Sequence, residues 1–294
     1  MQLGISFSPV EIGTDPVVLR DLAQAIEGAG IDFLAANDHV IGGHPDRLRP
    51  GEKVHTFDVP NSEPFTLLAF VAGATTRLGL TTSVVIAPQR QTVLLAKQAA
   101  ELDLLCSGRL RLGLGIGRNW MEYEALGESF SNRGRRIEEQ IAVMRRLWCE
   151  ELISFDGEWH HLDRLGLNPL PLQRPIPIWM GSFAGQLVEK VLERVGRLAD
   201  GWMPQFPPGD ALTEAIARLR GYARDAGRDP SAIGIECVVR VRPGEDPALW
   251  ASSAAACRAI GATHLRAATT GSVLDPRGFA DLMMRWREAV AGSA

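Results

Sequence analysis

The chain has 294 residues, of which 46% are hydrophobic and 22% are charged. This is the composition of an ordinary globular protein, so a disordered or low-complexity chain is excluded. Lysine and arginine together number 31 against 35 aspartate and glutamate residues, and the resulting net charge of -4 argues against a protein that coats nucleic acid.

The sequence shows no membrane or secretion signal. No apolar run approaches the roughly 18 residues that a membrane helix needs, and the first residues lack the basic start of a signal peptide. The four cysteines form no C-x-x-C pair, so we expect reduced, buried thiols. The sequence therefore predicts a cytoplasmic protein without a membrane or nucleic-acid partner.

Three histidines share one loop region, but their spacing does not indicate a metal site. His39, His44 and His55 lie near Asp38 and Asp46. This arrangement matches none of the common zinc patterns. We therefore expect no bound metal.

Short β-rich runs alternate with amphipathic stretches along the whole chain. Asp15 and Pro16 open the first helix, because aspartate caps a helix start and proline suits its first turn. In chain order, we expect strands at residues 3–8, 31–36, 78–86, 109–116, 176–180, 199–203, 233–241 and 263–268, and helices at 17–27, 64–76, 92–105, 132–150, 184–195, 209–226, 248–260 and 276–291.

Eight strand–helix units with no element left over predict an α/β fold, the (β/α)8 TIM barrel. We expect one such domain over residues 1–294, with insertions after the second strand and before the fifth. An open doubly wound sheet is the alternative. In a TIM barrel the active site lies at the C-terminal ends of the strands, so residues that follow the strands are the candidates for function.

The second strand leads into Asp38 and His39. An imidazole can donate to a cofactor atom or move a proton near neutral pH, which makes His39 the candidate catalytic residue. Asp38 could orient the loop or cap a backbone amide. A loop pair with local hydrogen bonds only is the alternative interpretation.

The fourth strand ends in Gly113, Gly115 and Gly117. Arg118 stands where a dinucleotide-binding G-x-G-x-x-G loop has its third glycine, and the strand is not the first, so that motif is not favoured. Glycines here would let a flat ligand approach the backbone. Tight packing of the barrel explains them equally well.

The fifth strand is followed by Gly181 and Ser182. Backbone amides at a helix start together with a hydroxyl suit a phosphate, and a serine that only caps the helix is the alternative. The charged residues at the start of the long helix predict a solvated or salt-bridged face; they are Arg133, Arg135, Arg136, Glu138 and Glu139.

Together these segments resemble the bacterial luciferase-like flavin and deazaflavin oxidoreductases. The resemblance rests on residues 30–33 leading into Asp38 and His39, on 78–88, on 107–117, on 123–127 followed by 133–139, and on 177–182 followed by 197–202. It implies a TIM barrel that binds FMN or coenzyme F420 at the strand C-termini. The compact length and the Asp38–His39 pair are more similar to the F420-dependent branch.

The resemblance also implies roles for single residues. The histidine at the position of His39 lies near the deazaflavin ring in that branch, and the Ser83–Val84 step matches a non-prolyl cis peptide whose bulge backs the ring. The residues that we expect to bind the cofactor are Asp38, His39, Ser83, Val84, Val85, Gly115, Gly117, Arg118, Met180, Gly181 and Ser182.

Two departures from the related sugar-phosphate dehydrogenases bear on the substrate. Those enzymes carry a tryptophan shortly after the histidine, where this chain has residues 40–43, Val-Ile-Gly-Gly. They carry a glutamate after the glycines of the fourth strand, where this chain has Arg118. Oxidation of a sugar 6-phosphate is therefore disfavoured, and the obvious proton donor is missing.

Three functions follow as hypotheses. The first is an oxidoreductase that transfers a hydride between F420 and a small organic substrate. The second is an FMN-dependent monooxygenase that uses O2 and reduced flavin from a partner reductase, and the third is a non-catalytic flavin-binding protein. A homodimer stays open. We expect the loop at residues 42–60 to shape the substrate side, with Arg47, Arg49 and Lys53 able to meet the glutamate tail of F420.

Overall fold

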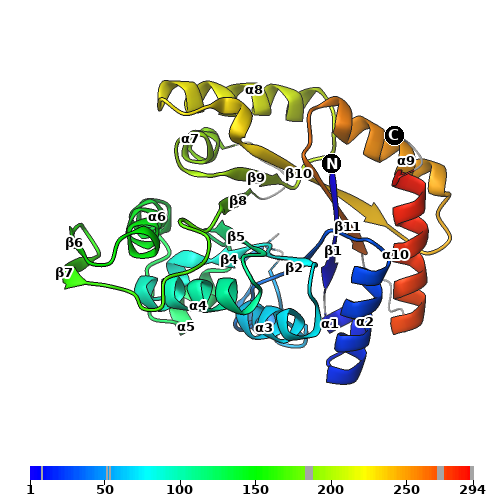
Figure 1. Cartoon of the computed structure of the whole chain (residues 1–294), viewed down its shortest axis with the longest axis horizontal. Helices are drawn as coiled ribbons and strands as arrows, with labels where there is room; N and C mark the ends of the chain where they lie inside the picture. The colour runs from blue at the N-terminus through cyan, green and yellow to red at the C-terminus, as the bar shows by residue number, and fades with distance from the viewer. Residues whose placement is uncertain (8, 51, 53, 183–187, 270–274, 292–294) are drawn as a thin grey trace.

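The chain folds around a closed barrel of parallel strands with helices on its outside (Figure 1). The computed structural model describes residues 1–7, 9–50, 52, 54–182, 188–269 and 275–291. The strands pair in the order β3-β2-β1-β11-β10-β9-β8-β5, and pairing of β3 with β5 closes the ring. The predicted TIM barrel is confirmed, and the open sheet is wrong because its edge strands pair with each other.

The barrel strands are β1 (Gln2–Phe7), β2 (Phe33–Ala36), β3 (Gly79–Thr82) with its continuation β4 (Val85–Ile86), β5 (Leu110–Gly115), β8 (Ile178–Ser182), β9 (Gly201–Pro204), β10 (Gly234–Val241) and β11 (His264–Thr269). The helices that follow these strands in turn are α2 (Pro16–Gly28), α3 (Pro64–Ala74), α4 (Thr92–Leu105), α6 (Arg133–Cys149), α7 (Glu189–Leu198), α8 (Asp210–Asp225), α9 (Pro247–Ala259) and α10 (Pro276–Ala291). Smaller elements are α1 (Pro9–Ile12), α5 (Trp120–Ala125), the hairpin β6 (Ile153–Asp156) with β7 (His161–Leu165), and the 3-10 turns η1 (Pro45–Arg47), η2 (Ala87–Gln89) and η3 (Pro230–Ala232).

Two differences from the predicted elements lie at the cavity described below, and others lie at strand starts, such as that of β8 at Ile178 instead of 176. The strand predicted at 78–86 is interrupted between β3 and β4, where the Ser83–Val84 peptide is cis, as the resemblance implied. The short helix α5 was not predicted. The predicted start of the helix at 184 and the predicted strand end at Ser8 lie outside the described residues. Among the helices described, none combines the length and apolar character needed to cross a bilayer.

Aromatic side chains fill the N-terminal end of the barrel. The His264 ring centroid lies 5.6 Å from that of Phe33 and 4.7 Å from that of Trp179, both in edge-on contact. The guanidinium of Arg111 lies 4.4 Å from the Phe33 and Trp179 centroids. A Cβ added to Gly201 would come within 2.2 Å of the Trp179 ring, so glycine is required there. The packed rings close this end of the barrel.

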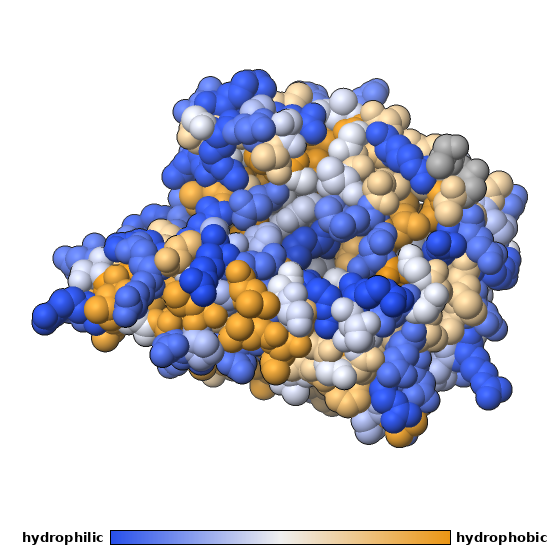
Figure 2. All heavy atoms as spheres, in the orientation of Figure 1, coloured by the Kyte–Doolittle hydropathy of each residue, from blue (hydrophilic) through white to orange (hydrophobic). Residues whose placement is uncertain are grey.

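Some apolar side chains remain exposed over α3 and α4 (Figure 2). Phe70 of α3 is 42% exposed, and Val93 and Leu94 at the start of α4 are 48% and 53% exposed. The possibility of a homodimer stays open.

The half-buried histidine of the barrel floor makes stability depend on pH. Burial and the charge of Arg111 lower the pKa of His264 from 6.5 to about 4. Between these values the unfolded chain holds a proton that the folded chain does not, so the free energy of unfolding falls as the pH falls through this window. We expect the free energy of unfolding, measured with urea, to fall more steeply with decreasing pH in the wild type than in His264→Gln. The difference in slope is at most about 1.4 kcal/mol per pH unit, and solvent screening makes it smaller. Parallel pH curves for the two proteins would contradict this.

Candidate active site

A cavity of about 720 Å³ opens at the C-terminal ends of the barrel strands. Its lining includes most of the residues that we predicted for the cofactor: Asp38, His39, Ser83, Val84, Gly115, Gly117, Arg118, Gly181 and Ser182. Further lining residues were not among the predicted cofactor residues; they include Asn37, His55, Trp202, Met203, Gln205 and Arg266. The cavity therefore lies where a barrel enzyme has its active site.

Two of the predicted cofactor residues do not line the cavity. Val85 is fully buried and Met180 is 2% exposed, and both belong to the hydrophobic core. Val84 and Gly181, the chain neighbours of these two residues, line the cavity instead. Contact of Val85 and Met180 with a cofactor stays a prediction that the lining of the cavity does not support.

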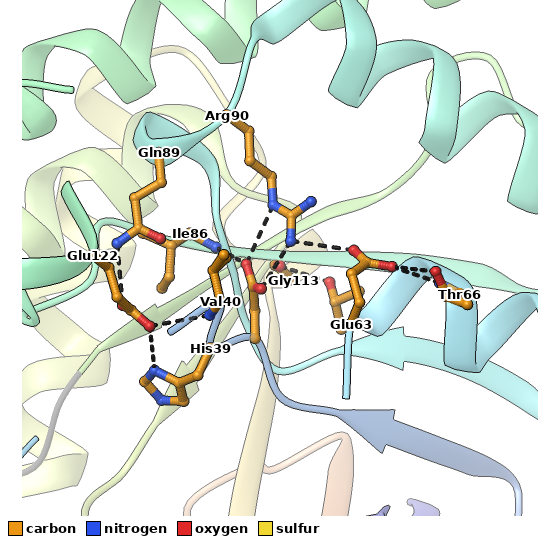
Figure 3. Close-up of polar contacts among 11 residues, drawn as sticks. His39, Val40, Glu63, Thr66, Ile86, Gln89, Arg90, Gly113 and Glu122 are labelled. Carbon is orange, nitrogen blue, oxygen red and sulfur yellow. Dashed lines mark hydrogen bonds and ion pairs between the residues drawn. The ribbon is translucent and has the colours of Figure 1, made fainter. Parts of the chain in front are cut away.

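Asp38 acts as the buried anchor of the turn that carries His39. Its Oδ2 accepts a hydrogen bond of 2.9 Å from the backbone amide of Ile86, and its Oδ1 lies 2.8 Å from Arg90 Nη2. Arg90 also pairs with Glu63 at 3.2 Å, and Figure 3 shows its guanidinium directed at the Glu63 carboxylate. Burial alone would lower the pKa of Arg90, but the two carboxylates raise it. Asp38 thus caps a backbone amide, as predicted.

His39 is oriented by a carboxylate from α5. Its Nδ1 lies 3.1 Å from Oε1 of Glu122, which is 1% exposed (Figure 3). The backbone amide of Val40 donates to the same oxygen at 3.2 Å, and Gln89 Nε2 donates to Oε2 at 3.2 Å. Because these neighbours are donors, we infer that the carboxylate is also the acceptor toward His39 and that Nδ1 carries the hydrogen. Nε2 is then the ring nitrogen available for proton transfer in the cavity.

Glu122 is a functional residue that the sequence analysis did not identify. Arg118 lies in the cavity wall after the glycines, as expected. The helix α5 follows it and carries Glu122, whose carboxylate contacts Nδ1 of His39. Asn119 caps this short helix by accepting from the amide of Met121 at 3.2 Å. An asparagine followed by Glu122 in the next turn is a helix-start signal, and it would have revealed α5.

The loop after β2 contributes His55 to the cavity wall. The rings of His55 and His39 are tilted against each other with centroids 3.7 Å apart. Burial, together with the neighbouring His39, lowers the pKa of His55. The expectation that this loop shapes the cavity is therefore supported by contact.

The cations of the same loop are engaged with α5. Arg47 lies 2.6 Å from Glu124, and the guanidinium groups of Arg47 and Arg49 lie 5.1 and 4.9 Å from the Trp120 ring centroid. Lys53 lies outside the described residues. These contacts fasten the described part of the loop to α5.

The glycines of β5 and β8 make room for Val84. A Cβ on Gly115 would lie 2.5 Å from Cγ2 of Val84, and one on Gly181 would lie 2.8 Å from Cγ1. At Gly113 a Cβ would meet the carbonyl oxygen of Thr82 at 1.9 Å, so packing alone requires that glycine. Gly115 and Gly181 fit both interpretations, tight packing and room for a ligand, because they leave space for Val84 and let its apolar atoms form a wall of the cavity.

Ser182 is the last residue of β8, and its side chain is already engaged. Trp202 Nε1 donates to its Oγ at 3.0 Å. The described part of α7 begins at Glu189, and Val188 before it makes no capping hydrogen bond through its side chain. Ser182 therefore does not cap the described helix, and the helix start expected at 184 lies outside the described residues.

The charged face at the start of α6 is salt-bridged, as predicted. Its ion pairs are Arg135 with Glu158 at 2.8 Å, Arg136 with Glu128, and Glu138 with Arg194 at 2.9 Å. Glu139 forms a hydrogen bond of 2.7 Å with Nδ1 of His160. Among the described side chains, no group of three or more His, Cys, Asp or Glu residues is placed to hold a metal ion.

The anchoring role of Asp38 predicts a large loss of stability on its removal. Asp38→Ala leaves the Ile86 amide without its acceptor and the buried Arg90 with Glu63 alone. We expect the free energy of unfolding to fall by about 3 kcal/mol, the scale of a broken buried ion pair. Urea unfolding measures this change. The control is Glu101→Gln, which removes an exposed ion pair with Lys97 and should cost about 0.5 kcal/mol or less. Equal losses in the two variants would show that Asp38 is not an anchor.

Comparisons with known proteins agree with this geometry. The luciferase-like monooxygenase model matches residues 5–291. An F420-dependent glucose-6-phosphate dehydrogenase of Tsukamurella paurometabola is 31% identical over 258 residues, which are 85% of this chain and 71% of that protein.

Solved structures share the fold at lower identity. Monooxygenase RslO1 from Streptomyces bottropensis superposes with a TM-score of 0.80 at 20% identity over 99% of both chains. An F420-dependent secondary alcohol dehydrogenase superposes with a TM-score of 0.79 at 18% identity over 98% of both chains. The chain therefore belongs to the luciferase-like monooxygenase family, and it is an oxidoreductase whose cofactor is a deazaflavin or a flavin.

Proposed function

We propose that this protein transfers a hydride between coenzyme F420 and a small organic substrate, with His39 as the acid–base residue. The observation that carries the proposal is the orientation of His39. Glu122 holds its Nδ1 at 3.1 Å, while the ring lines the cavity beside Val84. The similarity to an F420-dependent dehydrogenase supports F420 as the cofactor.

The cavity wall fits a flat conjugated ring. Val84 and Ile86 present apolar atoms to it, and Gly115 and Gly181 lack side chains that would push Val84 into the space. We assign Val84 to back one face of the ring and His39 to meet its polar edge. Bound F420 would supply a ring carbon that gives or accepts a hydride.

His39 accounts for the proton that accompanies the hydride. When an alcohol carbon loses a hydride, its hydroxyl proton must leave as well, and Nε2 of His39 can accept it. The ring then becomes a cation, which the Glu122 carboxylate at Nδ1 stabilises. In the reverse direction His39 returns the proton to a carbonyl oxygen.

The substrate is a small organic molecule other than a sugar 6-phosphate. The relative from Tsukamurella is named for glucose 6-phosphate. This chain has Val40 to Gly43 where such enzymes carry a tryptophan, and Arg118 where they carry a glutamate. Its cavity also receives His55 from the loop after β2. These differences change the side chains that would contact the substrate, so we expect a different substrate.

An FMN-dependent monooxygenase with a partner reductase is the second candidate. The apolar residues Val188, Val191 and Leu192 at the α7 side of the cavity favour it, because an apolar wall keeps water from a reactive oxygenated flavin. The two candidates differ in cofactor and in the need for O2.

Titration of the purified protein with F420 and with FMN, followed by fluorescence, separates them. We expect F420 to bind at least about tenfold more tightly, a difference of about 1.4 kcal/mol. Tighter binding of FMN, with substrate turnover that requires O2, would replace the proposal with the monooxygenase.

The role of His39 predicts a loss of rate without a loss of fold. With F420 bound and a panel of small alcohols as substrates, His39→Ala should lower turnover by roughly 10²–10⁴. Its melting temperature should stay close to that of the wild type, because the ring lies at the cavity wall and not in the core. His44→Ala, which changes an exposed histidine of the same loop, is the matched control. Normal turnover in His39→Ala would remove His39 from the chemistry.

A further inference from the structure

Two buried arginines share one carboxylate inside the barrel. Arg111 Nη2 lies 2.6 Å from Oε2 of Glu236, and Arg266 Nε lies 2.8 Å from Oε1 of the same residue. The side chains of Arg111, Glu236 and Arg266 are 12%, 0% and 6% exposed. Two positive charges thus face one negative charge among side chains that are at most 12% exposed.

The surroundings do not supply the missing negative charge. Arg266 Nη1 donates to the hydroxyl of Ser6, and Arg111 Nε donates to that of Thr81 at 3.3 Å. Across the side chains that the structure describes, no carboxylate other than Glu236 pairs with either guanidinium. His264 adds no positive charge at neutral pH, since burial and Arg111 lower its pKa to about 4. Arg111, Arg266 and Glu236 together therefore carry a net charge of about +1.

The two arginines differ in their access to ligands. Arg111 is enclosed between the rings of Phe33 and Trp179 on the barrel floor, whereas Arg266 lines the cavity. A buried charge without a counter-charge is costly, and a ligand in the cavity can provide that counter-charge. Arg266 is the member of the cluster that such a ligand can reach.

We propose that Arg266 binds an anion at the wall of the cavity. The anion is a negatively charged oxygen conjugated to a carbonyl, and it neutralises the excess positive charge of the cluster. The ring of the reduced cofactor and a substrate carboxylate both carry such an oxygen. The proposal rests on the proposed function only for the first source. A guanidinium suits this chemistry because it stays charged and donates in one plane.

The cofactor source has a redox consequence. A neutral oxidised flavin ring that takes up two electrons and one proton becomes an anion. A fixed positive charge beside the ring stabilises that anion relative to the oxidised form, so it favours acceptance of a hydride. If the substrate is the source, the charge holds the carboxylate and leaves the ring unaffected.

The first experiment compares wild type, Arg266→Gln and Arg266→Lys for binding of F420 and of FMN, each oxidised and reduced. We expect Arg266→Gln to weaken binding of the reduced cofactor at least about tenfold more than binding of the oxidised cofactor. For a two-electron couple this lowers the potential by about 30 mV. Arg266→Lys should retain most of the effect. Arg77→Gln, which removes an exposed arginine, is the control for charge and should change neither form.

The second experiment uses acetate as a carboxylate probe in thermal melting of the same variants. Stabilisation of the wild type that is lost in Arg266→Gln, with an unchanged ratio of reduced to oxidised cofactor binding, would identify the substrate as the source. Melting without ligand checks that the variants fold. Unchanged behaviour in both experiments would overturn the anion site. Failure of the wild type to bind either cofactor would overturn the proposed function, while the acetate experiment still tests Arg266.

Discussion

The geometry of the cavity depends on the buried carboxylate of Asp38. It joins the end of β2 to the end of β4, because one oxygen accepts from the amide of Ile86 and the other meets Arg90. Arg90 extends the link to Glu63, which also accepts from the amide of Thr66 in the first turn of α3. The turn that carries His39 is thereby held at a fixed distance from the segment that carries Val84. A mobile loop at this place would leave the histidine without a defined direction.

Three polar side chains at the cavity wall are held in the same way. Asp38 is paired with Arg90, His39 with Glu122, and Arg266 with Glu236. In each pair at least one member is buried, so the orientation of the side chain at the cavity wall is fixed before a ligand enters. The cost of burying these charges is offset by short, well-directed contacts. The net positive charge of the Arg111–Glu236–Arg266 cluster is the exception, and it is the feature that a ligand can complete.

Local patterns in the sequence predicted the barrel but only part of the site. The helices at 92–105 and 276–291 have the observed bounds, because caps and periodicity are local. His39 and the Ser83–Val84 step follow strands, and the rule for barrel strand ends places them at the cavity. Glu122 lies 83 residues from His39, and Arg266 pairs with a residue of another strand. The closed barrel brings such distant residues together, and local sequence periodicity does not predict these contacts.

The account depends most directly on the state of the His39 ring in the ligand-free protein. A long-range proton–nitrogen NMR correlation at mildly alkaline pH distinguishes the two neutral tautomers, and His39→Gln assigns the signals. If the Glu122 carboxylate accepts from Nδ1, His39 is the Nδ1–H tautomer, and Glu122→Gln weakens that preference. An Nε2–H tautomer in the wild type, or a spectrum that Glu122→Gln leaves unchanged, would contradict the proposed acid–base role.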